Sequence, residues 1–196
     1  SGKAPLPFAD KTFDYCICSH VLEDIRDPIH LCGEMIRAGK RGYIEVPSRA
    51  IESVIGLEGK NYAGYYHHRW LIEIQNSTIA FRHKPHMIHD SRRFHLPNLL
   101  LRRLTDEQRV SFLFWEESFL YHEIIQFSSA KVTRELNKFV RRQSLPAWYN
   151  ALDALYLPMK YFVKRVLGTL SPMRTSKFVR LDAASRAFCD RLPDIE

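Results

Sequence analysis

The sequence is 196 residues long, with 45% hydrophobic and 26% charged residues. Such a composition is ordinary for a globular protein with a packed core and excludes a fibrous or disordered chain. The formal net charge of +7 suits an acidic substrate, nucleic acid or an anionic membrane, but by itself it bears only on solubility and electrostatic steering. No apolar run approaches the roughly 20 residues that a membrane-spanning helix needs.

Cysteine usage points to a reducing compartment. The four cysteines are too few and too badly placed for a disulfide framework, and we expect Cys16 and Cys18, on one predicted strand, not to close on one another. We therefore expect a cytoplasmic protein with reduced thiols.

The first organised stretch, Leu6 to Ser48, alternates two nearly uncharged runs with one apolar-periodic run. The nearly uncharged runs are Tyr15 to Cys18 and Gly42 to Pro47, and they predict buried strands over Phe13 to Cys18 and Tyr43 to Val46. The segment between them predicts a crossover helix, so the three elements form a βαβ unit of a parallel sheet.

Local signals place the ends of this helix and the edge of the sheet. Asp27 is a plausible N-cap, Pro28 occupies the favoured first helical position, and Gly39 ends the helix. Ligands of such sheets bind at the carboxyl ends of the strands, which fall at Ser19–His20 and Pro47–Ser48.

Further along the chain, two β-rich runs around a short polar tip predict a hairpin. We expect a helix after it and then two more strands, the second an antiparallel partner at the sheet edge. These elements are the hairpin Arg69–Ile74 and Thr78–Arg82, the helix Leu96–Leu104, and the strands Ser111–Trp115 and Tyr121–Phe127.

The chain changes character near residue 130. Lys131 to Arg142 predicts a basic amphipathic helix, and the aromatic and basic stretch that follows is divided into short pieces by Pro146, Pro158 and Pro172. We expect an α/β core over residues 1–130 and a helical appendage over 131–196. The appendage either packs on its own domain or contacts a membrane surface. No nucleic-acid-binding module is recognisable, so no nucleic-acid partner is expected.

An ordered series of motifs runs through the βαβ unit. It resembles the carboxyl-terminal part of class I S-adenosylmethionine-dependent methyltransferases, in the branch that acts on small molecules. The motif residues are Leu6-Pro7-Phe8, Asp10, Phe13-Asp14, Ser19-His20-Val21-Leu22-Glu23, Glu34-Met35 and Arg37.

The resemblance implies a partial Rossmann-like sheet with a β-hairpin insertion and a helical carboxyl-terminal tail, and S-adenosylmethionine as cofactor. Leu6, Pro7 and Phe8 would lie beside the adenine. Cys18, Ser19 and His20 would form the loop near the methionine part and the sulfonium. His20 is either a pocket residue, with a catalytic role as a base that titrates near neutrality, or a loop residue that caps the next helix.

The chain departs from the family in two respects. Asp24 stands where the family usually has a second histidine, and the glycine-rich loop and ribose-binding carboxylate have no counterpart. The chain is therefore either a fragment of a longer enzyme or a diverged remnant. We favour the fragment, because a start in mid-fold would leave a bare sheet edge.

Histidines are frequent between residues 67 and 95. We expect no metal site, because Pro85 interrupts the run and His67 and His68 are adjacent and diverge. The segment after the second strand should overhang the active site. The expected substrate contacts are Glu45, Ser48, His67, His68 and Arg69.

The function that these observations predict is methyl transfer from S-adenosylmethionine to a small or lipid-linked acceptor. The alternative is a non-catalytic, methyltransferase-like interaction module, peripheral to a membrane if the tail binds one.

Overall fold

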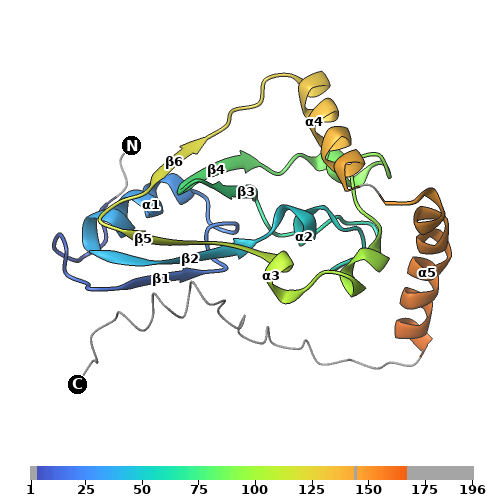
Figure 1. Ribbon diagram of the computed structural model, residues 1–196, viewed down its shortest axis with the longest axis horizontal. Coiled ribbons are helices and arrows are strands. Elements are labelled where there is room, and N and C mark those ends of the chain that lie inside the picture. Colours follow the sequence, from blue (N-terminus) through green and yellow to red (C-terminus); the bar gives the residue numbers. More distant parts are fainter. Residues whose placement is uncertain (1–3, 144, 167–196) are drawn as a thin grey trace.

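The computed structural model describes residues 4–143 and 145–166, which form helices and two small sheets (Figure 1). The elements in chain order are β1 (Cys16–Ser19), α1 (Pro28–Ala38), β2 (Arg41–Pro47), α2 (Arg49–Ser53), β3 (Trp70–Gln75), β4 (Thr78–His83), the 3-10 helices η1 (His86–His89) and η2 (Asn98–Arg102), α3 (Asp106–Arg109), β5 (Val110–Glu116), β6 (Leu120–Glu123), α4 (Ser129–Arg142) and α5 (Ala147–Val166).

The first sheet has the order β1-β2-β5 and contains the predicted βαβ unit. β1 pairs parallel with β2, and Cys18 lies opposite Ile44. β5 runs antiparallel on the other side of β2. The fold class is thus mixed α/β, as predicted.

Helix α1 begins and ends where its sequence signals predict. The side chain of Asp27 accepts a hydrogen bond from the His30 N–H at 2.8 Å, and Pro28 occupies the first turn, where a missing N–H costs nothing. The backbone becomes extended at Gly39, whose N–H still donates to the Met35 carbonyl. Arg37, in the last turn, faces the negative end of the helix dipole.

The second sheet has the order β3-β4-β6 and is built on the predicted hairpin. Asn76 and Ser77 form its two-residue turn, both with positive φ, as turns that match the twist of the strands require. β6 pairs parallel with β4, so the expectation that residues 121–127 supply an antiparallel edge strand to the first sheet is wrong. β5 holds that position instead.

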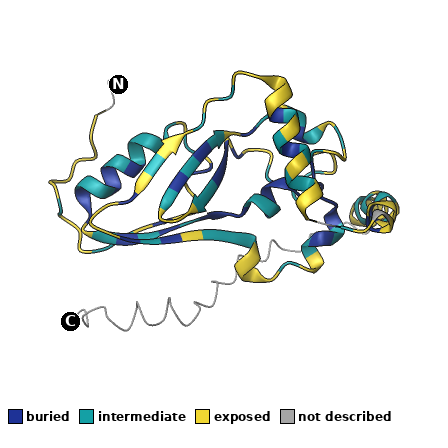
Figure 2. Ribbon diagram, turned by 45° about the horizontal axis from the view of Figure 1, so that its top comes forward, coloured by how far each residue is buried: buried dark blue, intermediate teal, exposed yellow. Residues whose placement is uncertain are grey.

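The main core lies between the two sheets and α1, where the buried positions of Figure 2 concentrate. Ile44 and Trp115 of the first sheet, Ile79 and Phe81 of the second, and Cys32 of α1 belong to one cluster. Cys16 and Cys18, two residues apart on β1, both pack on this core, and Cys16, Cys18 and Cys32 are free thiols.

Helices α4 and α5 lie at one end of the molecule (Figure 1). Val132 and Leu136 of α4 are buried in a second cluster with Leu71 and Ile88. α5 packs chiefly on η2, where the Tyr149 hydroxyl donates to the Leu99 carbonyl at 3.0 Å.

Two predictions about helices need correction. Pro158 lies inside α5 and does not divide it; Pro172 lies outside the described residues. The helix expected over Leu96–Leu104 is only the 3-10 turn η2. Among the described helices, none is long and apolar enough to cross a membrane.

Candidate functional site

The carboxyl ends of β1 and β2 bring together a polar group that we call the His20 cluster: Ser19, His20, Glu23, Tyr43 and Glu45. His20 lies just after β1 with φ +53° and donates its backbone N–H to the Glu45 carbonyl at 3.0 Å. Its ring lies between two carboxylates, with Nδ1 3.2 Å from Glu23 Oε1 and Nε2 3.3 Å from Glu45 Oε1.

Two hydroxyl groups complete the cluster. The Ser19 hydroxyl donates to Glu45 Oε1 at 3.0 Å, and the Tyr43 hydroxyl donates to Glu45 Oε2. Burial and the neighbouring Glu45 carboxylate raise the pKa of Tyr43, which keeps its hydroxyl a donor. Glu45 is therefore held from three sides.

The hydrogen bonds that the His20 ring donates to Glu23 and then to Glu45 raise the pKa of His20 to about 9, and burial offsets only part of this effect. His20 in turn lowers the pKa of Glu45. At neutral pH the ring is therefore an imidazolium, which cannot accept a proton. The prediction of a base that titrates near neutrality does not fit this geometry.

Glu23 is the buried member of the cluster, with 1% of its surface exposed. One of its carboxylate oxygens faces His20, and the other has no hydrogen-bond partner among the described residues. Two carboxylates around one imidazolium leave one negative charge in excess. Such a cluster attracts a cationic group.

The predicted adenine contacts, Leu6, Pro7 and Phe8, lie elsewhere on the βαβ unit. All three are exposed, and Arg37 holds their loop by donating to the Leu6 and Phe8 carbonyls at 3.1 and 2.7 Å. The Leu6 N–H donates to Glu34 at 2.7 Å.

Arg37 belongs to the last turn of α1 and Glu34 lies three residues before it, whereas His20 follows the carboxyl end of β1. An antiparallel crossover helix places its last turn at the amino ends of the strands, so this loop lies at the opposite end of the unit from the carboxyl end of β1, which His20 follows (Figure 1). The described residues do not join the two predicted cofactor segments in one pocket.

The predicted substrate residues divide into two kinds. Ser48 is buried and caps α2, with its hydroxyl donating to the Gln108 carbonyl at 2.7 Å. The Arg69 backbone pairs with Glu23 and Lys84, and its side chain is exposed. His67 and His68 lie beside Asp24, the residue next to Glu23.

The two adjacent histidines converge, contrary to the sequence-based expectation. Their ring centroids are 4.6 Å apart, and their Nε2 atoms lie 3.8 and 3.7 Å from Asp24 Oδ1. The later histidines serve other contacts: His89 Nδ1 accepts from the Ala63 N–H, and His95 Nδ1 bonds to the Ile88 carbonyl.

Sequence reasoning missed the buried pair that supports these histidines. Glu52 accepts a hydrogen bond from His68 Nδ1 and another from Lys84 Nζ, both at 2.7 Å. Side-chain exposure is 2% for Glu52 and 5% for Lys84. A carboxylate inside the apolar run from Ile51 to Ile55 was the available signal, since a buried charge needs a partner.

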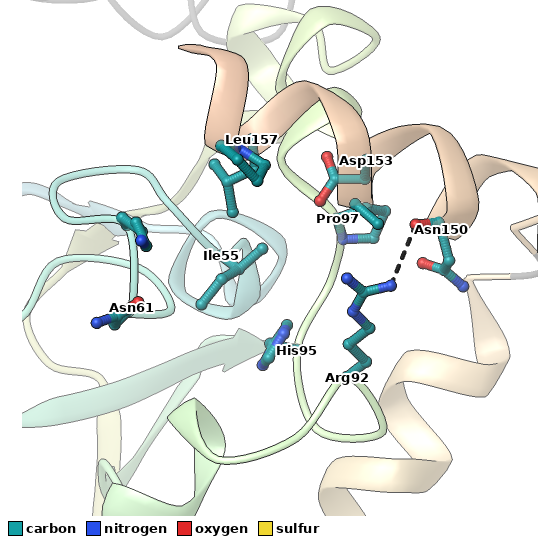
Figure 3. A pocket seen from close by; sticks show the side chains of 11 residues that line it. Ile55, Asn61, Arg92, His95, Pro97, Asn150, Asp153 and Leu157 are labelled. Carbon is teal, nitrogen blue, oxygen red and sulfur yellow. Dashed lines mark hydrogen bonds between the residues drawn. The ribbon is translucent and has the colours of Figure 1, made fainter. Parts of the chain in front are cut away.

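One pocket lies away from the His20 cluster and from His67 and His68 (Figure 3). About 180 Å³ in volume, it separates α5 from the segments around Ile55 and His95, and Arg92 closes one side by donating to the Asn150 carbonyl at 3.4 Å. A wider cavity of about 530 Å³ is lined by Arg49, Arg82 and other residues of β3, β4 and α4. Neither of these two cavities is lined by His20 or Glu45. We therefore identify the candidate site with the polar residues at the carboxyl ends of β1 and β2.

The fold and the site so far define a βαβ unit in a mixed sheet, with a charged group at the carboxyl ends of its two parallel strands. Residues 2–44, which contain β1, α1 and the start of β2, match the model of a family described as a methyltransferase domain. This match covers about a fifth of the chain. It confirms the resemblance to class I S-adenosylmethionine-dependent methyltransferases and supports S-adenosylmethionine-dependent methyl transfer in general. Searches of curated proteins and of solved structures gave no significant match.

Proposed function

We propose that this chain is the carboxyl-terminal part of an S-adenosylmethionine-dependent methyltransferase that acts on a small or lipid-linked acceptor. The observation that carries the proposal is the His20 cluster at the carboxyl edge of a βαβ unit, most of which lies within the matched residues 2–44. Ligands of such sheets collect at this edge.

The charge of the cluster fits the cofactor. S-adenosylmethionine supplies an activated methyl group on a positively charged sulfonium, together with a cationic ammonium. The net negative His20 cluster attracts such a group, and the unpartnered oxygen of buried Glu23 has an unused acceptor position. In this proposal the end of β1, with Cys18 and Ser19, and the following residue His20 lie around the methionine end.

His20 acts here by position and charge. Its imidazolium holds Glu23 and Glu45 in place, so the carboxylates do not need to reorganise when a cation binds. In-line methyl transfer depends mainly on the alignment of the reacting atoms, so the chain needs no general base. The assignment of Leu6, Pro7 and Phe8 to the adenine stays a prediction, and their position at the far end of α1 does not favour it.

We propose that the methyl acceptor binds beside the turn that carries His67, His68 and Arg69. Both histidines lie beside Asp24, and the Arg69 backbone N–H donates to the Glu23 carbonyl. Glu45 contacts His20 itself. An acceptor bound at this turn would therefore lie next to the residues proposed around the methionine end. Ser48 contributes indirectly, by fixing the start of α2.

We further propose that the first sheet is part of a Rossmann-like sheet and that the β3–β4 hairpin is inserted after β2. β1 has a strand partner on one side only among the described elements, and Ile17 on it is 73% exposed. An exposed apolar sheet edge can pair with strands of other chains, so proteins usually cover such an edge. Additional strands of a longer enzyme would cover it. The three cysteines among the described residues are free thiols, which suits the cytoplasm.

One observation favours the alternative of a membrane-peripheral interaction module. The apolar residues Trp148, Leu155, Met159 and Phe162 of α5 are each at least 58% exposed and recur at helical spacing. Lys164 and Arg165 lie on the same helix. This is the composition of an interfacial helix.

Isothermal titration with S-adenosylmethionine tests the proposal. We expect the longest natural form of the protein to bind the cofactor and the E23Q variant, which removes one charge from the cluster, to bind about tenfold or more weakly. E123Q, an exposed carboxylate on β6, is the matched control and should bind like the wild type. Absence of binding by the natural form would leave only the interaction module.

A further inference from the structure

We propose that Asp24, His67 and His68 bind a divalent transition-metal ion. The three residues place one ligand atom each within 4.8 Å of one another, and no other such group of three occurs among the described residues. This site does not depend on the proposed methyl transfer.

The ligand spacing suits a metal better than a set of hydrogen bonds. Both Nε2 atoms lie 3.7–3.8 Å from Asp24 Oδ1, too far for a hydrogen bond. In a tetrahedral zinc site with bonds of about 2.0–2.1 Å, the ligand atoms lie about 3.4 Å apart. A tetrahedral site would therefore need each Nε2 atom to move a few tenths of an ångström closer to Asp24 Oδ1, and the three ligand atoms, which lie within 4.8 Å of one another, to converge on one centre.

The other ring nitrogens determine which atoms face the centre. His68 Nδ1 lies 2.7 Å from Glu52 Oε1, and His67 Nδ1 lies 3.2 Å from Glu58 Oε2. An ionised carboxylate only accepts, so each Nδ1 carries a proton. The Nε2 atoms are then the ring nitrogens left to face Asp24 Oδ1, and a cation between these three atoms would be their common partner.

Metal-binding histidines usually donate their second ring N–H to a carboxylate, which fixes the ring and strengthens the ligand. Both histidines have this arrangement here. Glu52 is itself held by Lys84 and packs against Gly64, where an added Cβ would lie 2.7 Å from Glu52 Oε2. The supporting residues are therefore rigid on the His68 side.

The ligand types indicate the class of ion. Two imidazoles and one carboxylate favour zinc or a similar transition metal over magnesium or calcium, which prefer oxygen. His68 is buried, but the side chains of His67 and Asp24 are 44% and 43% exposed. Three ligands with one side open to solvent leave a coordination position for water or a substrate oxygen.

Zinc titration of the metal-free full chain tests the proposal. We expect saturable binding of one Zn²⁺ by calorimetry, and with Co²⁺ we expect visible absorption bands of a four- or five-coordinate ion. D24N and H67A change exposed ligands and should fold normally. Each should weaken zinc binding at least tenfold and abolish the cobalt bands. E58Q leaves the three ligands in place and alters the carboxylate that contacts His67 Nδ1 and the Tyr66 N–H, and it should weaken binding by about 10- to 100-fold.

The matched control is H122A, which removes an exposed histidine of β6 and should bind zinc like the wild type. Circular dichroism of the metal-free variants verifies that they are folded. Lack of saturable binding by the wild type would overturn the proposal. So would D24N and H67A proteins that bind zinc as tightly as the wild type.

Discussion

His20 shows how the neighbours of a residue decide its role. The motif predicted a residue at the ligand edge of the sheet, and the structure places His20 there. The motif alone did not reveal that Glu23 and Glu45 would both contact the ring. Glu45 lies 25 positions further along the chain and reaches His20 only through the parallel pairing of β1 and β2, which places it opposite Ser19.

The raised pKa of His20 predicts a pH-dependent stability. A histidine whose pKa is higher in the folded state than in the unfolded state stabilises the fold fully below about pH 6.5. It loses this contribution as the pH rises through about 9. The effect should be on the order of 1 kcal/mol, because the side chain is 41% exposed and solvent screens its ion pairs.

Denaturant unfolding of the wild type and H20N between pH 6 and pH 10 measures this contribution. Asparagine tolerates the positive φ of this position. The stability advantage of the wild type over H20N should shrink across that range. An advantage that grows with pH would show that the ring is neutral in the folded protein.

At the scale of elements, short sequence patterns predicted those features of the fold that depend on contacts between residues close in sequence. The cap of α1, the hairpin and the start of α4 follow from residues close in sequence. The partner of β6 does not, because period-two alternation indicates a strand but not its neighbour. A sharp turn at Glu117, with φ +61°, directs the chain away from the first sheet toward β4.

Helix α5 shows a second limit of local signals. Pro158 removes one backbone donor, but Asp153 accepts from the Leu99 N–H at 2.8 Å and Lys160 donates to the Gly56 carbonyl at 3.2 Å. These contacts flank the proline and hold the helix on the rest of the molecule. Tertiary contacts therefore outweigh the cost of an exposed proline.

The exposed apolar residues of α5 predict membrane binding. We expect the chain to sediment with vesicles that contain anionic lipids at low salt, and less at high salt because its basic residues are screened. L155E and F162E, at positions 75% and 67% exposed, should lower the bound fraction several-fold without loss of stability. E116Q, on an exposed position of β5, is the control. Equal sedimentation of all forms would exclude α5 as the contact.

At the scale of the whole molecule, the predicted site is only partly assembled. The carboxyl edge of the sheet joins His20 and Glu45 to the turn that carries His67 and His68. The loop of Leu6, Pro7 and Phe8 lies at the opposite end of α1. Sequence order could not show this separation, because both segments lie within 15 residues of one another along the chain.

Photolabelling with radioactive S-adenosylmethionine tests the central claim, that the cofactor binds at the carboxyl edge of the first sheet. Trypsin separates the two predicted cofactor segments, since it cleaves after Lys3, Lys11 and Arg26. In the longest natural form of the protein, we predict that label within this chain appears in the peptide of residues 12–26, which contains Cys18, Ser19 and His20, and is displaced by unlabelled cofactor. Displaceable label confined to other peptides of this chain would contradict the account.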